Sequence, residues 1–226
     1  MLVGAETSIG AAEAGSRWRS DLDPGALPPT PAMSAGQRRV MRASLVHFAA
    51  RGYGGSNIRD IAATLGIQAA SVYKHFASKE AILAALVFLG YDFHRETILQ
   101  AVMAADSAPE AQLAALVSAH VRLHCEYPRL SQVTHHEWGH LSQPNLMALA
   151  RQTDQTNAVL ASILRRGMAS GAFRIPDSSL AVVSISGLGM SAALWFPYQA
   201  EKSAEEVIAD FTRTALNMCC FQGVPA

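Results

Sequence analysis

Charged residues are scarce in this chain of 226 residues, at 16% of the sequence against 50% hydrophobic residues. So much apolar material with so little charge excludes an intrinsically disordered chain and indicates a packed globular protein. Runs of β-branched residues are short, whereas Ala, Leu, Met and Gln are abundant. This composition favours helix throughout the chain. The formal net charge of +0, taken alone, argues against nucleic-acid binding.

Cysteine is also rare, with Cys125, Cys219 and Cys220 as the only three. Their spacing fits neither a disulfide framework nor a zinc site and is typical of a reducing cytosol. The N-terminus lacks a basic stretch followed by an apolar one and predicts no secretory signal. The uncharged stretch from Ser178 to Ala200 is long enough to span a bilayer. Its serines and glycines and the lack of a basic flank instead favour a buried helix, so we expect a cytoplasmic protein with no membrane segment.

The balance of charge is uneven along the chain. Residues 34–80 contain seven Lys and Arg residues and two acidic residues. From residue 81 onward there are nine Lys and Arg residues and twelve acidic residues. A basic module joined to a mildly acidic one suits a protein whose one end meets phosphates. Ordinary scatter of surface charge is the alternative, and the counts alone do not decide between the two.

The pattern predicts an all-α chain in three segments. Residues 1–33 are rich in Ala, Gly, Pro and Ser and predict a disordered N-terminal arm, because such a segment cannot offset its ordering entropy. Residues 34–80 predict a bundle of three short helices, and residues 81–226 predict a larger helical domain. The expected helices are 34–51, 58–65, 69–76, 78–104, 109–126, 129–141, 145–171, 178–196 and 203–221.

Local signals predict several helix ends. A Ser followed three residues later by Gln or Glu predicts a capping box, and these pairs are Ser34–Gln37, Ser107–Glu110 and Ser203–Glu206. In the N-terminal bundle, Gly66 can take the left-handed conformation of a sharp turn. Val72 and Phe76, one turn apart, seal the third helix to the first two. Three short helices, a glycine turn and excess positive charge indicate a helix-turn-helix DNA reader.

Five short motifs run through this bundle. They are FAARGY at 48–53, IRDIA at 58–62, LGI at 65–67, SVYKHF at 71–76 and SKEAIL at 78–83. In this order and spacing they resemble the signature of the TetR family of transcriptional regulators. The resemblance implies a helix-turn-helix domain joined to a helical ligand-binding and dimerisation domain. We expect such a regulator to be no enzyme and to need no cofactor or metal.

The third helix and its flanks carry the residues expected to contact DNA, which are Arg59, Gln68, Ala69, Ser71, Tyr73, Lys74, His75 and Lys79. Gln68 suits bidentate pairing with adenine, and Ala69 is small enough to let the helix enter the major groove. Tyr73, His75 and Lys79 suit contacts with phosphates. The resemblance itself assigns DNA contact to Arg59, Tyr73, His75 and Lys79.

The resemblance also implies a homodimer through the last two helices, 178–196 and 203–221. Small residues would let the first of these pack closely against its mate, namely Ser184, Gly187, Ser191 and Ala192. Such a dimer would bind a palindromic double-stranded DNA operator as a repressor and be released by a small-molecule inducer.

The region 127–173 is similar to the subgroup that senses acyl-CoA thioesters in lipid and steroid catabolism. This likeness predicts an apolar ligand pocket with an anion-binding mouth. The residues expected to line it are Tyr91, Met103, Arg122, Trp138, Met168 and Trp195, with Arg129 as an alternative to Arg122. The competing interpretation makes these aromatic residues ordinary core.

The stretch His136-Glu137-Trp138-Gly139-His140 matches the HExxH pattern of zinc hydrolases, in which two histidines on one helical face bind metal and the glutamate activates water. This gives an alternative function, a metal-dependent hydrolase or a metal-responsive regulator. The pattern needs a third ligand, and no histidine follows His140. His120 and His124 could supply one, although they precede the motif.

Overall fold

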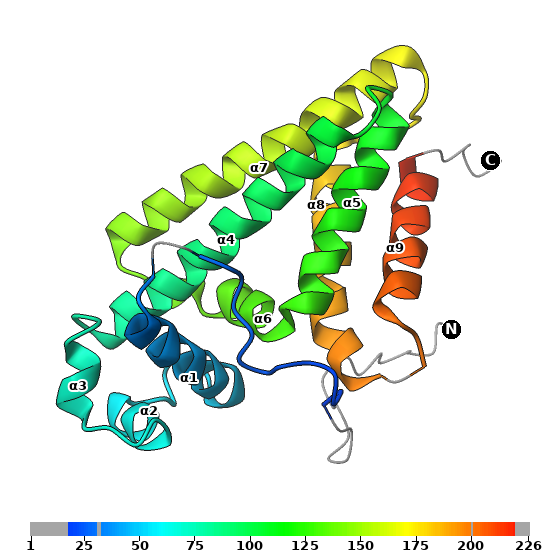
Figure 1. Cartoon of the computed structure of the whole chain (residues 1–226). Helices are drawn as coiled ribbons and strands as arrows, with labels where there is room; N and C mark the ends of the chain where they lie inside the picture. The colour runs from blue at the N-terminus through cyan, green and yellow to red at the C-terminus, as the bar shows by residue number, and fades with distance from the viewer. Residues whose placement is uncertain (1–17, 31–32, 200, 220–226) are drawn as a thin grey trace, which may run out of the picture.

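The computed structural model describes residues 18–30, 33–199 and 201–219, and within these ranges it is helical with no strand. The all-α fold is thereby confirmed. A bundle of three helices lies at one corner of the molecule (Figure 1), formed by α1 (Ala35–Arg51), α2 (Ile58–Thr64) and α3 (Ala69–Tyr73). The remaining helices are α4 (Lys79–Ala104), α5 (Pro109–Glu126), α6 (Pro128–His136), α7 (Gln143–Ser170), α8 (Ser178–Trp195) and α9 (Ala204–Cys219). Two short 3-10 turns, Trp138–His140 and Phe196–Tyr198, follow α6 and α8.

The predicted helix caps have mixed outcomes. The capping box of Ser34 with Gln37 is present. The box before α9 is present as well: the Ser203 hydroxyl accepts from the Glu206 amide, and the Glu206 carboxylate accepts from the Ser203 amide. The box expected at Ser107–Glu110 is wrong, because α5 begins after Ala108 with no side-chain cap. The Asp106 carboxylate instead accepts the hydrogen bond from the Ala108 amide at 2.9 Å. The side-chain bond before α5 is therefore made one residue earlier and to a different amide than the capping box requires.

Two hydrophobic cores stabilise the fold. The first joins α1, α2 and α3 to α6 and to the N-terminal half of α4, through residues such as Phe48, Val72 and Leu86. The second joins α5, α7, α8 and α9 to the other half of α4, through Ile98. Helix α4 therefore enters both cores, and Figure 1 shows it running diagonally from the three-helix bundle along α7. A shift of α4 would therefore change the packing of both cores.

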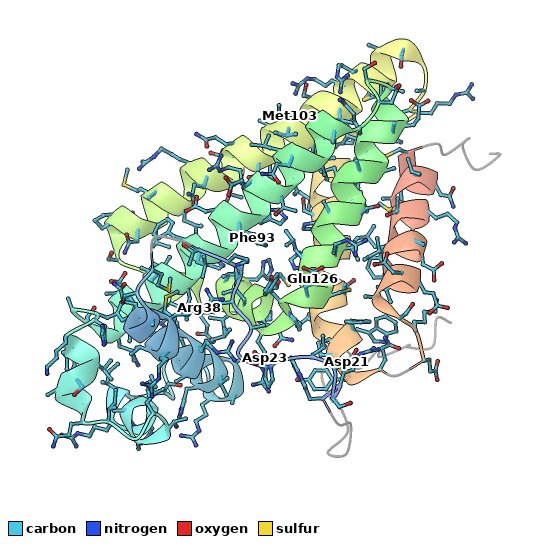
Figure 2. All side chains as sticks on the ribbon, in the orientation of Figure 1. Asp21, Asp23, Arg38, Phe93, Met103 and Glu126 are labelled. Carbon is cyan, nitrogen blue, oxygen red and sulfur yellow. The ribbon has the colours of Figure 1, made fainter. Side chains whose placement is uncertain are left out.

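The segment 18–30 packs along the body, which differs from the disordered arm expected for 1–33. Leu27 is buried, and the Arg38 guanidinium donates to the backbone carbonyls of Leu27 and Pro28. The Asp23 carboxylate pairs with Arg42 on α1 at 2.6 Å. Figure 2 shows this path, with Asp21 near the end of α8 and Asp23 beside α1. Apolar contacts and hydrogen bonds from two arginines of α1 offset the ordering entropy on which the composition-based expectation rested. Residues 1–17, 31 and 32 lie outside the described residues.

Helix α8 is not a buried helix within one chain, contrary to expectation. Leu180 is 63% exposed and Val183 is 68% exposed, whereas Ile185 and Ala192 are buried against the second core. In the described part of the chain, Ser178–Tyr198 is the one helical stretch whose length and composition would allow it to cross a membrane. One face of α8 is thus packed, and the opposite apolar face has no cover from its own chain.

Candidate functional site

The bundle of α1, α2 and α3, which we call the reader, depends on α2, the turn after it and α3. The Asn57 side chain caps α2 by accepting from the Asp60 amide. Gly66 has a φ of 67°, so the expected left-handed turn residue is present. Val72 is fully buried beneath α3, and its carbonyl accepts from the amides of His75 and Phe76. The third helix is thereby held by its inner face, which leaves its outer face available.

The expected DNA contacts are distributed around that outer face. Arg59, Gln68, Lys74 and His75 are exposed, Tyr73 is 53% exposed, and Ala69 and Ser71 are half-buried. The His75 ring lies against Gly36 of α1, where any side chain would overlap it. His75 therefore also helps to seat α3 on α1.

Lys79, for which a phosphate contact is expected, has partners within its own chain. Its Nζ donates to the backbone carbonyls of Tyr53 and Ser56, each at 2.8 Å, and lies 4.0 Å from the centre of the Tyr53 ring. These bonds tie the first turn of α4 to the loop between α1 and α2. In this conformation Lys79 positions the reader, because two of its three N–H donors are already used.

A cavity of about 750 Å³ lies in the second domain, lined by α4, α5, α6, α7 and α8 and open to solvent on one side. Its lining is largely apolar, with histidine, serine, threonine, asparagine and tyrosine side chains as the polar groups. No Asp, Glu, Lys or Arg is among these lining residues in the described part of the chain. A volume of this size is in the range that holds drug-sized ligands.

Most of the residues expected to line the ligand pocket lie elsewhere. Tyr91 lines the cavity, but the other five do not. Figure 2 places Met103 near the far end of α4, where it is 82% exposed. The remaining aromatic and sulfur side chains are also exposed, with Trp138 at 48%, Met168 at 40% and Trp195 at 46%. The spacing of apolar residues along a helix does not determine which of its sides faces the cavity, because five helices together form that cavity.

The two arginines expected at the pocket mouth have other partners. Arg122 forms a bidentate ion pair with Glu205 on α9, at 2.6 and 3.0 Å. This pair raises the pKa of Arg122 and lowers that of Glu205. The Arg129 guanidinium stacks over the Trp18 ring at 4.4 Å. Neither arginine provides a positive charge to the cavity.

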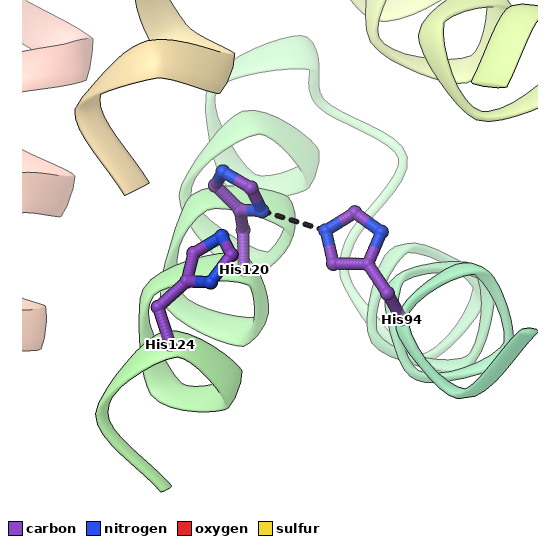
Figure 3. Close-up of side chains that lie close together, drawn as sticks. All are labelled: His94, His120 and His124. Carbon is purple, nitrogen blue, oxygen red and sulfur yellow. Dashed lines mark hydrogen bonds between the residues drawn. The ribbon is translucent and has the colours of Figure 1, made fainter. Parts of the chain in front are cut away.

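Three histidines meet inside the cavity, two from α5 and one from α4 (Figure 3). The His94 Nε2 and the His120 Nδ1 lie 2.6 Å apart, and the His120 Nε2 lies 3.1 Å from the backbone oxygen of Ser186 on α8. The His124 ring is 4.5 Å from that of His120, centre to centre. Neither nitrogen of His124 has a hydrogen-bond partner, although both are buried.

Burial keeps these three imidazoles neutral. Loss of solvation lowers the pKa of His94 to about 3, with a further contribution from His120. The same cause lowers the pKa of His120 and places that of His124 well below the ordinary value. A neutral imidazole at physiological pH has a free nitrogen lone pair, which can accept a hydrogen bond or bind a metal.

The HExxH match does not form a metal site in this fold. Helix α6 ends at His136, and Trp138–His140 forms a 3-10 turn, so the two histidines do not share one helical face. His140 stacks on Tyr53, and its Nε2 lies 3.5 Å from the Glu137 carboxylate. The hydrolase alternative is therefore not supported.

Sequence reasoning noticed two members of the buried cluster but not their role. His120 and His124 are four residues apart, a spacing that places them on one face of a helix. This signal was available and was considered only as an addition to the HExxH motif. His94 carries no comparable signal, because its proximity to α5 depends on how α4 packs.

Fold and reader together define a helix-turn-helix transcriptional regulator. Residues 40–86 match the family described as bacterial regulatory proteins, tetR family, and residues 106–219 match the tetracyclin repressor-like C-terminal domain. The second match alone covers half of the sequence. The chain belongs to the TetR family, whose members are DNA-binding regulators and not enzymes.

Individual relatives agree with this assignment. The repressor KstR2 of Mycolicibacterium smegmatis is 28% identical over 187 residues, which cover 80% of this chain and 89% of the relative. A tetR-family regulatory protein from Rhodococcus RHA1 is 29% identical with a TM-score of 0.75, covering 83% of this chain and 98% of that one. AibR, solved with isovaleryl coenzyme A and operator DNA, is 20% identical with a TM-score of 0.72 over 79% of this chain and 97% of that one. The last likeness shows the fold alone.

Proposed function

We propose that this protein is a dimeric, cytoplasmic repressor that binds a palindromic operator through α3 and releases it when an apolar small molecule enters the cavity. The observation that carries the proposal is the position of α4, which joins the core of the reader to the wall of the cavity. The reader supplies DNA binding and the cavity supplies ligand dependence.

The charge and exposure of the reader support DNA binding. The excess of basic residues over 34–80 attracts phosphates, and Arg59, Tyr73 and Lys74 are exposed to meet them. Gln68, at the start of α3, is exposed at the position that would reach a base edge. Phosphate contacts fix the register of the helix and base contacts select the sequence.

The size and lining of the cavity support an apolar effector. A large volume walled by residues such as Leu116, Leu123 and Met190 favours a hydrocarbon or sterol-like group over a polar one. AibR, which shares the fold, binds isovaleryl coenzyme A. An acyl-CoA thioester with its acyl part in the cavity is the ligand class that we test first.

The exposed apolar face of α8 supports the dimer. Leu180, Val183 and Leu194 follow one another at helical spacing and are exposed, which is costly in water without a partner. Gly187 and Ser191 lie between them and are exposed as well, and this part of α8 also lines the open side of the cavity. The expected role of Ala192 does not apply, because that residue is buried within its own chain. A second copy of α8 and α9 would cover this face.

Ligand release follows if the cavity prefers one position of α4. An effector shifts an equilibrium only by its difference in affinity for the two states. Because α4 is the wall of the cavity and also a support of the reader, a ligand that fits one arrangement of α4 changes the separation of the two readers in the dimer. DNA affinity then falls.

The test is selection of bound duplexes from random DNA, followed by titration with acyl-CoA thioesters of increasing chain length. We expect an inverted repeat, an affinity that falls steeply with salt, and release by one chain-length class. Tyr73→Ala should weaken binding by roughly ten- to a hundredfold through loss of a charge-assisted phosphate bond, and Tyr73→Phe, which removes only the hydroxyl, should reproduce most of this loss. Absence of any preferred duplex would overturn the regulator; selection without release would overturn only the ligand class.

A further inference from the structure

We propose that His94, His120 and His124 bind a divalent transition-metal ion inside the effector cavity. Each of the three side chains offers one ring nitrogen, and these atoms lie within 4.8 Å of one another. Imidazole is a preferred ligand of Zn²⁺, Cu²⁺, Ni²⁺ and Fe²⁺. Three protein ligands with positions left open is the arrangement of zinc sites that also bind a further molecule.

The helices bring the three rings together from two directions. His120 and His124 are one turn apart on α5, and His94 approaches from α4 (Figure 3). Gly189 of α8 makes room for the His120 ring, since any side chain at that position would overlap it. The cluster is therefore built by close packing of three helices, which keeps the rings in place without a bound ion.

His120 already has the outer contact that metal-binding histidines commonly make. Its Nε2 donates to the Ser186 carbonyl at 3.1 Å, which fixes the tautomer and leaves a lone pair on Nδ1. In the metal-free protein, the His94 Nε2–H donates to that lone pair across 2.6 Å. A shift of the proton to the Nδ1 of His94, with the two rings moving apart to the roughly 3.3 Å that separates two nitrogens on a tetrahedral ion, would leave both facing nitrogens free to bind the same ion.

His124 is the least satisfied group in the cluster. Both of its ring nitrogens are buried and lack a hydrogen-bond partner. Leaving a buried polar atom unpaired is unfavourable, so an ion that bonds to one of these nitrogens recovers part of that cost. A purely structural histidine would be expected to have at least one bond.

The surroundings indicate what else the ion would bind. No carboxylate or cationic side chain lines the cavity within the described residues, so the charge of a divalent ion would be uncompensated there. The open positions of the ion face the cavity, and an anionic donor from solvent or from a cavity ligand would complete them. The ion would then supply the positive charge that Arg122 does not provide.

The experiment is direct metal binding to the untagged full-length protein, without DNA or effector. After dialysis against chelator, Zn²⁺ is titrated in competition with a chromogenic chelator. We expect one ion per protomer, and at least a hundredfold weaker binding in His94→Gln and in His124→Gln. His135→Gln, in the cavity but outside the cluster, and the exposed His136→Gln are the matched controls and should bind as wild type. Circular dichroism establishes that each variant is folded.

Cobalt supplies a second measurement that a loose surface site would not pass. Co²⁺ bound to three imidazoles in an enclosed site should give visible absorption bands, and added azide should shift them if a position remains open to the cavity. Failure of wild type to bind Zn²⁺ at micromolar concentration, or equal binding by the His94 and His124 variants, would overturn the site. Because neither measurement uses DNA, this proposal and the proposed function can fail separately.

Discussion

The two ends of this regulator are assembled in different ways. The reader, α1 to α3, is built from residues close in sequence, with caps, a glycine turn and a small core of its own. The cavity draws its lining from five helices between residues 90 and 194. The site in the reader is formed by residues close together in the sequence. The site in the cavity is formed by the packing of helices that are far apart in the sequence. The following predictions test this contrast, from the largest effect to the smallest.

Val72→Asp tests whether the reader depends on its own core. Val72 is fully buried beneath α3, and an unpaired buried charge there should cost about 3–5 kcal/mol. We expect operator binding to be lost in fluorescence anisotropy while most of the helicity remains. Val72→Ala, at about 0.8 kcal/mol per lost methylene plus a small cavity, should retain measurable binding. Loss of the whole fold in the aspartate variant would show that the two cores are one unit.

Gly189→Ala tests the packing of the cavity end. The added methyl group overlaps the His120 ring, so overpacking should cost about 1–3 kcal/mol of unfolding free energy and weaken Zn²⁺ binding. Operator affinity in the absence of effector should stay within twofold. Gly187→Ala, on the same helix with open space around the new methyl group, is the control, and sedimentation checks its dimer. Equal loss in both variants would contradict the role given to Gly189.

The pH dependence of stability should separate the two ends. Because burial holds the pKa of His94 at about 3, the folded state stays unprotonated there while the unfolded state gains a proton below about pH 6.5. Stability is therefore intact above pH 6.5 and falls as pH decreases towards 3, by about 1.4 kcal/mol per pH unit for this histidine. His120 and His124 add to the loss with the same sign.

Chemical denaturation with chelator present, at pH 7.0, 6.0 and 5.0, measures this slope. His94→Gln and His124→Gln should each flatten it, and the exposed His136→Gln should not. A wild-type slope of zero across this range would mean that the cluster is protonated in the folded state and is not closed to water.

Arg122→Ala should have the smallest effect. The guanidinium pairs with the exposed Glu205 and does not line the cavity, and exposed ion pairs contribute little to stability. We expect the thermal midpoint, operator affinity and acyl-CoA response to match wild type in parallel titrations. If the effector response alone disappears, the anion site lies on α5 after all, and the sequence-based expectation for Arg122 was sound.

The structure of the reader could be predicted because its helix caps and its turn each depend on residues a few positions apart. Asn57, Gly66 and the Ser34–Gln37 box behave as the sequence indicates. Local reasoning failed at Ser107, where Asp106 supplies the hydrogen bond instead. At Lys79 it did not reveal the two backbone carbonyls that Nζ bonds, since a lysine that suits a phosphate suits carbonyl oxygens equally well.

The cavity was mostly unpredictable for the corresponding reason. Met103, Met168 and Trp195 were chosen by residue type, but each is exposed and none lines the cavity. The orientation of a helix about its axis is set by all of its neighbours together, and a single sequence does not record it. His120 and His124 were detectable as a pair, but the contribution of His94 depends on the approach of α4 to α5.

The segment 18–30 gives the reader a second mechanical link to the body, besides α4. At one end Trp18 packs edge-on against Tyr198, and Arg19 lies over the Phe196 ring. At the other end the segment is bonded to Arg38 and Arg42 of α1. Because the segment is attached to both α1 and the end of α8, we expect α1 and α4 to move together. We expect a shortened protein that begins near Met33 to keep only the link through α4, so that ligand binding would change DNA affinity less strongly.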